Sequence, residues 1–413
     1  MAKKGFVHST ALLAVTGALV AMAPLAQASE ASATTTQYAF TADAFGSSVT
    51  VGAAGLGVGS GKSAYTILSC TSTPQTHTNS TSGISIPGVA TSGGAVTDTV
   101  ASAHNVGTGT WSDTADSTVG SINALGGRIK ASAITTHAQA AEAPGGATAS
   151  GTTSLASLSV GGHTMSANPA PNTKINLAGI GTVTLNAQKS VRNASQALMQ
   201  VDAIKVVLAA GNTLGAPVGA TVIIGQTLAV VDGPVDGLLS GYSYGTSLTG
   251  NPIANSGPSF VNYLSCTGTG GNTTTVQGAG VSVGPLRTGA ITDTATGTNT
   301  VSQLSANTTS TIASAGVSGV LSLTAIHVTA SASVTGGTFA DSGGLTISGL
   351  KVLGLTVPLP NVVPANFSVP LLGGTLILNR QVKSANRIVV NGVYLKLPSV
   401  GTVTIGWASA GAK

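Results

Sequence analysis

Short runs of alternating apolar and polar residues, or of consecutive β-branched residues, follow one another along most of the chain and are separated by Gly, Asn, Pro and Ser. Runs of this kind at regular spacing are typical of the strands of a β-sandwich or β-barrel. A helical period is nearly absent, and only residues 194–200 suit one or two helical turns. The pattern therefore predicts an all-β fold. The clearest predicted strands are residues 182–185, 203–208, 321–328, 352–357, 375–378 and 393–397.

Several segments occur twice, in the same order and at nearly the same spacing, which indicates an internal duplication. Each copy ends in a β-branched run, and the Asp-Gly and Gly-Pro pairs within residues 231–237 mark a boundary between the copies. The sequence therefore predicts two tandem β-sandwich-like domains, residues 29–235 and residues 236–413. The repeated segments are 45–48 and 244–247, 65–70 and 261–266, 94–99 and 289–294, and 185–188 and 378–381.

Residues 1–28 have the features of a secretory signal peptide. Lys3 and Lys4 give a positive start, residues 11–23 are apolar, and Ala-Gln-Ala at 26–28 is a small-residue cleavage site. The apolar stretch is shorter than the roughly 20 residues that a membrane-spanning helix needs. No later stretch has the length and apolarity of a membrane span, and no sorting motif is evident at the end. We therefore expect a secreted protein, extracellular or held non-covalently at the cell surface.

Composition bears on the surface and on possible partners. Only 7% of the residues are charged and 3% are aromatic, whereas an average domain has about 25% charged residues. Because 42% of the residues are apolar, a core can still form, from Val, Ile, Leu and Ala rather than from rings. Outward-facing Thr hydroxyls can keep such sheets soluble without charge. The net charge of +5 forms no basic cluster with interleaved aromatics, which argues against nucleic-acid binding.

Candidate catalytic groups are few. Residues 280–284 spell a nucleophile elbow around Ser282, but Pro285 and a turn follow where that motif needs a helix, so a strand serine is the simpler interpretation. Of the 11 acidic residues, only Asp98 and Asp293 occupy matching places in both copies. Paired acid–base catalysis in each copy needs two such positions. We expect no catalytic residues and no enzyme activity, with a secreted hydrolase as the remote alternative.

Metal ligands show no recognisable spacing. The histidines are scattered, without a His-x-x-His or Cys–His cluster. Asp98, Asp113 and Asp116 form a local acidic group, but the second copy keeps only the first of them. Calcium takes about six to eight oxygen ligands, which this group does not supply. We expect no metal and no cofactor.

Two amide pairs recur at the same place in both copies and are the candidate binding residues. They are Asn186 with Gln188, and Asn379 with Gln381. Repeated amides at a strand end can fix strand register through buried hydrogen bonds. The alternative is a shared pocket for a polar ligand, and the sequence leaves both interpretations open.

The two cysteines, Cys70 and Cys266, occupy equivalent positions in the two copies. Export places them in an oxidising environment, where an even number of cysteines suggests a disulfide. Such a bridge has to cross between the copies and needs Cα atoms about 4.4–6.8 Å apart. The alternative is that each thiol is a small buried apolar side chain, or pairs with a partner outside the chain.

Residues 165–177, with the sequence Met-Ser-Ala-Asn-Pro-Ala-Pro-Asn-Thr-Lys-Ile-Asn-Leu, and the segments 179–188, 201–206 and 221–225 resemble a known family. The chain is similar to the "choice-of-anchor P" proteins, which are exported surface proteins of Gram-positive bacteria. The resemblance implies export and surface display rather than a reaction, and it supplies no catalytic or binding residues. This chain differs in having Ala187 where an acidic residue is expected.

These observations lead to one functional expectation with an alternative. We expect a non-enzymatic structural or adhesive protein whose partners are cell-wall polymers, extracellular polysaccharide or copies of itself. Large sheets rich in Thr, Ser and Gly, with few charges, suit contact with such neutral surfaces. The alternative is an extracellular ligand- or glycan-binding module that uses the recurring Asn and Gln side chains.

Overall fold

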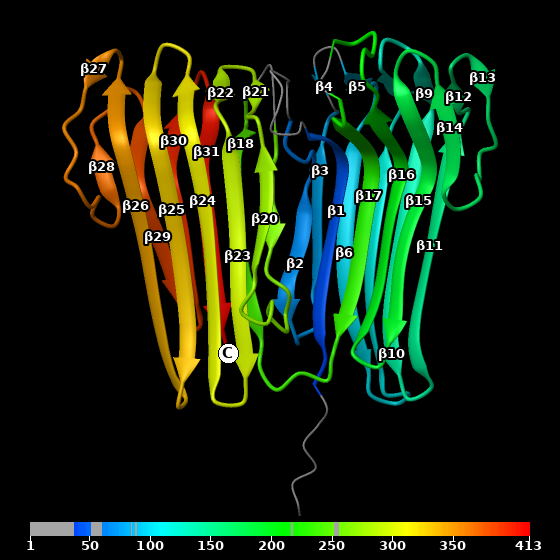
Figure 1. Cartoon of the computed structure of the whole chain (residues 1–413), viewed down its shortest axis with the longest axis horizontal. Helices are drawn as coiled ribbons and strands as arrows, with labels where there is room; N and C mark the ends of the chain where they lie inside the picture. Colours follow the sequence, from blue (N-terminus) through cyan, green and yellow to red (C-terminus); the bar gives the residue numbers. More distant parts are fainter. Residues whose placement is uncertain (1–36, 51–59, 84, 87–88, 216–217, 252–255) are drawn as a thin grey trace, which may run out of the picture. The chain divides into compact units, whose positions relative to one another are not determined.

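The computed structural model describes residues 37–50, 60–83, 85–86, 89–215, 218–251 and 256–413. The predicted signal peptide, residues 1–28, lies outside the described residues. The part of the chain that the structure describes contains strands and turns but no helix, which confirms the all-β prediction (Figure 1). Within those ranges, no helix is therefore long and apolar enough to cross a membrane.

Two antiparallel sheets face each other in the N-terminal part of the chain and form a sandwich. A six-stranded sheet has the order β14-β15-β16-β17-β1-β2, and a five-stranded sheet has the order β11-β10-β7-β6-β3. The six-stranded sheet consists of β1 (Ala39–Thr50), β2 (Thr66–Thr71), β14 (Thr173–Leu177), β15 (Gly181–Asn193), β16 (Gln196–Leu208) and β17 (Thr221–Asp232). The five-stranded sheet consists of β3 (Thr76–Thr81), β6 (Val96–Asn105), β7 (Thr110–Val119), β10 (Ala133–Ala143) and β11 (Gly146–Ala156).

A third sheet in the same part is built from very short strands in the order β13-β12-β9-β8-β5-β4. Its strands are β4 (Ser85–Ile86), β5 (Ala90–Ser92), β8 (Ile122–Ala124), β9 (Ile129–Ala131), β12 (Ser159–Val160) and β13 (His163–Thr164). Buried side chains of this sheet, such as Ile122 and Ile129, join the same core as the main sandwich.

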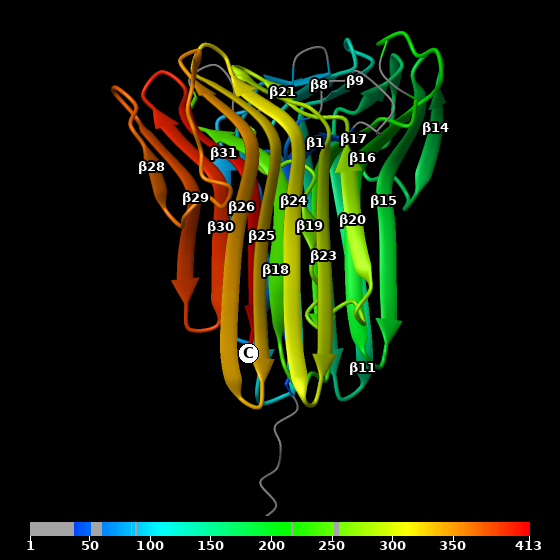
Figure 2. The ribbon, with the colours of Figure 1, turned by 60° about the vertical axis from the view of Figure 1, so that its left-hand side comes forward.

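The C-terminal part forms a second sandwich from a six-stranded and an eight-stranded sheet. The first has the order β19-β18-β31-β30-β29-β28, and the main path of the second is β20-β23-β24-β25-β26-β27. Figure 2 shows the long strands β23 to β26 running side by side. The six-stranded sheet consists of β18 (Leu239–Thr249), β19 (Asn262–Tyr263), β28 (Phe367–Val369), β29 (Thr375–Ser384), β30 (Arg387–Leu397) and β31 (Gly401–Ala412). The eight-stranded sheet consists of β20 (Thr273–Gly278), β21 (Ser282–Val283), β22 (Leu286–Thr288), β23 (Ile291–Thr300), β24 (Gln303–Val317), β25 (Leu321–Thr335), β26 (Thr338–Val352) and β27 (Leu355–Thr356).

Most core side chains of both sandwiches are aliphatic, as the composition predicts. Burial alternates along the strands, for example in β23, where every second residue from Ile291 to Gly297 is buried. This period follows from the pleat, which points successive side chains to opposite faces. In the first sandwich the core includes Ile134, Leu185 and Ile204. The corresponding core of the second sandwich includes Ile312, Ile326, Leu378 and Val393.

Each sheet takes its strands from one side of the predicted boundary near residue 235. The described residues nevertheless belong to one compact unit. The division into two domains and their origin by duplication stay predictions. What the structure adds is a contact region between the two sandwiches, which we call the seam.

Two local predictions need correction. Residues 194–200 form no helical turn, because residues 194 and 195 make the tight turn of the hairpin between β15 and β16, and β16 begins at Gln196. The pairing of each hairpin strand with its partner outweighs the weak helical preference of this Ala-containing segment. The predicted strand 352–357 is also broken, because Leu353 and Gly354 take positive φ angles and turn the chain between β26 and β27.

Candidate functional site

Backbones of the two sandwiches come into direct contact at the seam. The Gly61 amide donates a hydrogen bond to Ser256 Oγ at 2.8 Å, and the Lys62 amide donates to the Pro258 carbonyl at 3.0 Å. A Cβ atom on Gly61 would overlap the Gly257 carbonyl oxygen, and one on Gly257 would overlap the Lys62 carbonyl oxygen. Glycine is therefore required at both positions for this approach.

The structure joins Cys70 and Cys266 in a disulfide across the seam, with Cα atoms 5.3 Å apart. Cys70 lies in β2 and Cys266 follows β19, and both side chains are buried. The Thr41 hydroxyl lies 3.0 Å from the Cys266 sulfur and 3.5 Å from the Cys70 sulfur. The sequence left open whether the two cysteines form a disulfide or remain separate thiols, and the structure contains the disulfide.

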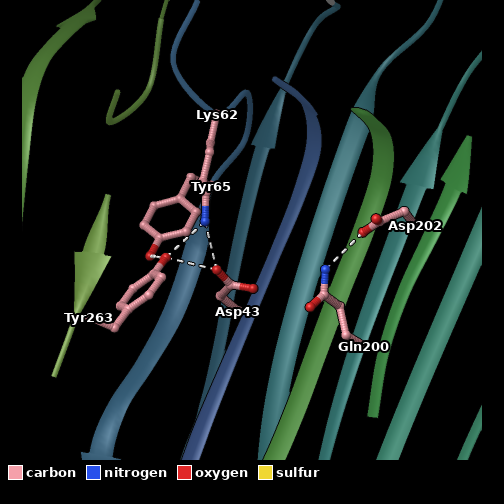
Figure 3. Close-up of polar contacts among 6 residues, drawn as sticks. All are labelled: Asp43, Lys62, Tyr65, Gln200, Asp202 and Tyr263. Atoms are coloured by element: carbon pink, nitrogen blue, oxygen red, sulfur yellow. Dashed lines mark hydrogen bonds and ion pairs between the residues drawn. The ribbon is translucent and has the colours of Figure 1, made fainter. Parts of the chain in front are cut away.

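A buried polar cluster lies beside the disulfide and consists of Asp43, Lys62, Tyr65 and Tyr263 (Figure 3). We call it the seam cluster. Lys62 Nζ lies 2.7 Å from Asp43 Oδ2 and donates to the Tyr263 hydroxyl at 2.9 Å. Tyr263 donates in turn to Asp43 Oδ2 at 2.7 Å, and its hydroxyl also contacts that of Tyr65. The cluster combines β1 and the segment before β2 with β19 of the other sandwich.

Aromatic rings enclose the Lys62 ammonium. Its nitrogen lies 4.6 Å from the Phe45 ring centroid, 4.8 Å from that of Tyr65 and 5.0 Å from that of Tyr263. These separations allow cation–π attraction, which gains strength where the cation is desolvated. The Lys62 side chain is 15% exposed and that of Asp43 is 4% exposed.

A ring stack continues the cluster into the second sandwich. Tyr244 and Trp407 lie with centroids 5.4 Å apart, and Tyr242 lies 6.1 Å from Trp407 and 6.3 Å from Tyr263. The whole chain has only two Trp, six Tyr and six Phe. Several of these scarce rings therefore gather at the seam. A second group, Tyr38, Phe40 and Trp111, packs together in the first sandwich.

The electrostatics of the seam cluster keep its phenols protonated. Burial raises the pKa of the Tyr65 hydroxyl well above its usual value of 10, and the Asp43 carboxylate raises it further. The same two causes, in the same order, raise the pKa of Tyr263. Both phenols therefore act as hydrogen-bond donors or acceptors and not as phenolates.

Asp202 lies on β16, which β17 separates from β1 and its Asp43, and it accepts a hydrogen bond from Gln200 Nε2 at 3.2 Å (Figure 3). Burial raises its pKa, while the Gln200 hydrogen bond and the charge of Lys205 lower it. Asp43 and Lys62 also act on it, with opposite signs. Asp202 therefore senses the charges of the seam cluster without bonding to it.

Two buried carboxyls, Asp98 on β6 and Asp293 on β23, occupy matching positions in the two sandwiches. Both are fully buried, and neither accepts a hydrogen bond of regular geometry within the described ranges. Burial raises the pKa of Asp98 to about 8, although the nearby Ser117 hydroxyl lowers it in part. Burial likewise raises the pKa of Asp293 well above its usual value, against a smaller opposing effect of Ser310. Burial therefore favours the protonated form of both carboxyls, and Asp98 is mostly protonated at neutral pH.

The candidate amides hold loops to strands in an identical way in both sandwiches. Asn186 donates to the Pro169 carbonyl, and Gln188 donates to the Gly151 carbonyl and to Asn186 Oδ1. The second sandwich has the same three bonds. Asn379 donates to the Val363 carbonyl, and Gln381 donates to the Gly343 carbonyl and to Asn379 Oδ1. The structure thus places each pair in internal hydrogen bonds, which favours the register interpretation over a ligand pocket.

The other sequence candidates lie apart from the seam cluster. Ser282 is in the short strand β21, with a turn after it and no helix. On the outer face of the five-stranded sheet, Asp116 Oδ1 lies 2.8 Å from His137 Nδ1. Asp113 is buried and accepts a hydrogen bond from the Val230 amide. Among the residues that the structure describes, no three His, Cys, Asp or Glu side chains are grouped so as to hold a metal ion.

Rows of polar side chains, most of them hydroxyls, cross the outer faces of the five-stranded and eight-stranded sheets, which we call the hydroxyl faces. On the five-stranded sheet, one row crosses all strands at exposed positions. On the eight-stranded sheet, neighbouring hydroxyls bond to each other, as between Thr294 and Thr309 at 2.6 Å. The first row consists of Ser80, Thr97, Thr118, Thr135 and Ser154. A corresponding row on the eight-stranded sheet carries three hydroxyls, on Thr292, Thr311 and Thr346, together with Gln277 and His327.

A hydroxyl-lined cavity of about 390 Å³ also opens at the seam. Ser60, Ser63 and Asn79 line it from the first sandwich, and Ser256 and Ser282 line it from the second. It contains no charged lining residue among those described.

Comparison with known proteins found no matching family model, no similar characterised protein and no similar solved structure.

Sequence reasoning missed the seam cluster because its members share no motif. The one available signal was the cysteine pair: Tyr65 precedes Cys70 by five residues, and Tyr263 precedes Cys266 by three. A bridge between the cysteines brings both tyrosines to the same place. Lys62 and Asp43 have no such signal, since no repeated segment contains either residue.

Proposed function

We propose that the protein is a secreted, non-enzymatic adhesive or structural protein that lays its hydroxyl faces against cell-wall polysaccharide. The observation that supports this is the row of exposed Ser and Thr side chains across the five-stranded sheet. Neighbouring strands lie about 4.8 Å apart and alternate residues about 7 Å apart, so the hydroxyls form a regular two-dimensional array. A polysaccharide presents hydroxyls that can exchange hydrogen bonds with such an array.

The rest of the structure suits a passive, load-bearing role. The long strands of both sandwiches are paired along their length, and a disulfide and a buried polar cluster hold the sandwiches together. The seam cluster is too enclosed to admit a substrate, since the Asp43 side chain is only 4% exposed. Rigid faces bind with little loss of conformational entropy, which helps an array of individually weak contacts.

The test is co-sedimentation of residues 29–413 with insoluble cell walls from a Gram-positive bacterium. The triple variant Thr97→Val, Thr118→Val and Thr135→Val removes three hydroxyls and keeps the β-branched shape. Each hydrogen bond contributes roughly 1 kcal/mol, so we expect affinity to fall about tenfold or more. Because the array is nearly uncharged, binding of the unmodified protein should persist in high salt.

The matched control is Thr182→Val with Thr184→Val on β15, which removes hydroxyls from a different sheet. This control should bind walls like the unmodified protein. Equal binding by the triple variant, with an unchanged melting temperature, would contradict the proposal. Sedimentation of the protein without walls would instead show self-association through these faces, which would also contradict a polysaccharide partner.

A further inference from the structure

The pair formed by Lys62 and Asp43 differs from the other ion pairs in the described part of the chain. Its two side chains are 15% and 4% exposed, whereas the His137–Asp116 pair is 39% and 54% exposed. The Lys383–Asp341 pair keeps its lysine 55% exposed. Withdrawing two opposite charges from water carries a large desolvation penalty that their mutual attraction does not always offset. A neutral covalent product at the same place avoids that penalty.

We propose that Lys62 and Asp43 form a self-modification site, at which Lys62 Nζ condenses with the Asp43 carboxyl carbon to give an intramolecular amide bond and one water molecule. Three distances carry this inference. Lys62 Nζ lies 2.7 Å from Asp43 Oδ2, Tyr263 Oη lies 2.7 Å from the same oxygen, and Nζ lies 2.9 Å from Tyr263 Oη. The amine, the carboxyl and a shared hydroxyl thus form a closed triangle of hydrogen-bond distances.

The triangle provides a route for both protons that the reaction moves. Lys62 Nζ gives a proton to Tyr263 Oη while Tyr263 gives its own proton to Asp43 Oδ2, which leaves a neutral amine beside a neutral carboxyl. The amine lone pair then attacks the carboxyl carbon. A second proton passes from nitrogen to Oδ2 by the same route, the bond from carbon to Oδ2 breaks, and water leaves. The ammonium and carboxylate together supply every atom of the amide and the water, and nothing is oxidised or reduced.

The surroundings of the pair hold it in place and favour the product. The main chain of Lys62 is fixed by its bond to the Pro258 carbonyl, and Asp43 lies within β1. Such positioning raises the effective concentration of the reacting groups. Asp43 Oδ1 is buried and accepts no hydrogen bond in the described residues. An unpaired buried carboxylate oxygen is costly, and the reaction would convert it into a neutral amide oxygen.

The decisive measurement is mass spectrometry of the reduced, alkylated and trypsin-digested chain of residues 29–413. Lys62 is the first tryptic site of this chain and Arg128 is the next. An amide at Lys62 blocks cleavage there, so we expect one peptide, 29–128, lighter than its sequence mass by one water. Separate peptides 29–62 and 63–128 of full mass from the folded protein would overturn the proposal.

Matched variants locate the bond and test the relay. Lys62→Arg keeps the positive charge and should restore cleavage and full mass. Tyr263→Phe keeps the ring and the ion pair but removes the shared hydroxyl, so it should slow or abolish the loss of water. Lys383→Arg, in the exposed pair, should leave the lighter peptide unchanged. A lighter peptide in Lys62→Arg would show that water is lost elsewhere and would reject the assignment.

Discussion

Buried acids are the most unusual feature of this protein at the scale of single residues. The chain has 11 acidic residues, and most of those that the structure describes are buried. Burial raises the pKa of Asp98 and Asp293, and it does the same for Asp113, Asp202 and Asp232. Even fewer charged groups therefore reach the surface than the composition of the sequence indicates. The sequence identifies Asp98 and Asp293 as matching positions, but only their burial in the structure shows that the protonated form of each carboxyl is favoured.

The raised pKa values predict that stability falls as pH rises. The unfolded chain releases the Asp98 proton near pH 3.8, whereas the folded chain keeps it to about pH 8. Between these values the folded state binds more protons, so the free energy of unfolding decreases with pH. The stabilisation is present below pH 3.8 and is lost progressively up to about pH 8, by on the order of a few kcal/mol for such a group. Urea unfolding across this range measures it.

Asp98→Asn provides the specific test, because the amide mimics the protonated carboxyl at every pH. The variant should be more stable than the unmodified protein at about pH 8 and no more stable at about pH 4, so its pH slope should be flatter. Asp236→Asn, at an exposed position, is the control and should leave the slope unchanged. A slope that is the same in all three proteins would contradict a neutral Asp98.

At the scale of strands and hairpins, the sequence predicts much of what the structure shows. Alternating runs at 182–185, 203–208 and 393–397 fall within β15, β16 and β30. The pattern works there because one face of each strand packs on an aliphatic core. It fails at residues 194–200, where strand pairing decides the conformation, and at 353–354, where backbone turns carry no hydrophobic signal.

The recurring Asn residues show how a strand detail can resemble a binding site. Asn186 and Asn379 have φ angles of 48° and 49°, and each lies where the strand pairing skips one residue. Asn is among the few residue types that adopt such angles readily. A residue repeated for backbone geometry is indistinguishable in sequence from one repeated for ligand binding. The hydrogen bonds to Pro169 and Val363 separate the two interpretations.

Asn186→Ala should destabilise the first sandwich, because alanine tolerates the positive φ angle poorly and loses the bond to the Pro169 carbonyl. We expect a decrease of about 1–3 kcal/mol in the free energy of unfolding. Asn186→Gly should recover part of the loss, since glycine adopts this backbone conformation without strain. Denaturant unfolding of the two variants compares them directly. Unchanged stability in Asn186→Ala would argue for the ligand-pocket interpretation instead.

At the scale of the whole described chain, the seam is where sequence reasoning ends. The repeated segments predict that two similar units exist, but Asp43, Lys62 and Tyr65 have no counterparts that would reveal how the units meet. Contacts between distant segments depend on the three-dimensional arrangement of both sandwiches, which no local pattern encodes. Cys70 and Cys266 are the exception, since an even number of cysteines, in a chain predicted to be exported, already suggests a bridge.

The seam leads to a prediction about how the protein unfolds. Each sandwich has an aliphatic core of its own, and the disulfide closes a loop with a sequence separation of 196 residues. Replacing both cysteines by serine removes the constraint on the unfolded chain and should lower stability by about 2–4 kcal/mol. With the sandwiches no longer tied, we expect calorimetry to resolve two transitions in place of the single transition of the unmodified protein. Ser265→Ala, beside the bridge, is the control and should retain one transition. A single transition at the original temperature in the double variant would mean that the seam cluster and its backbone contacts suffice to join the two sandwiches, and that they are not independent domains.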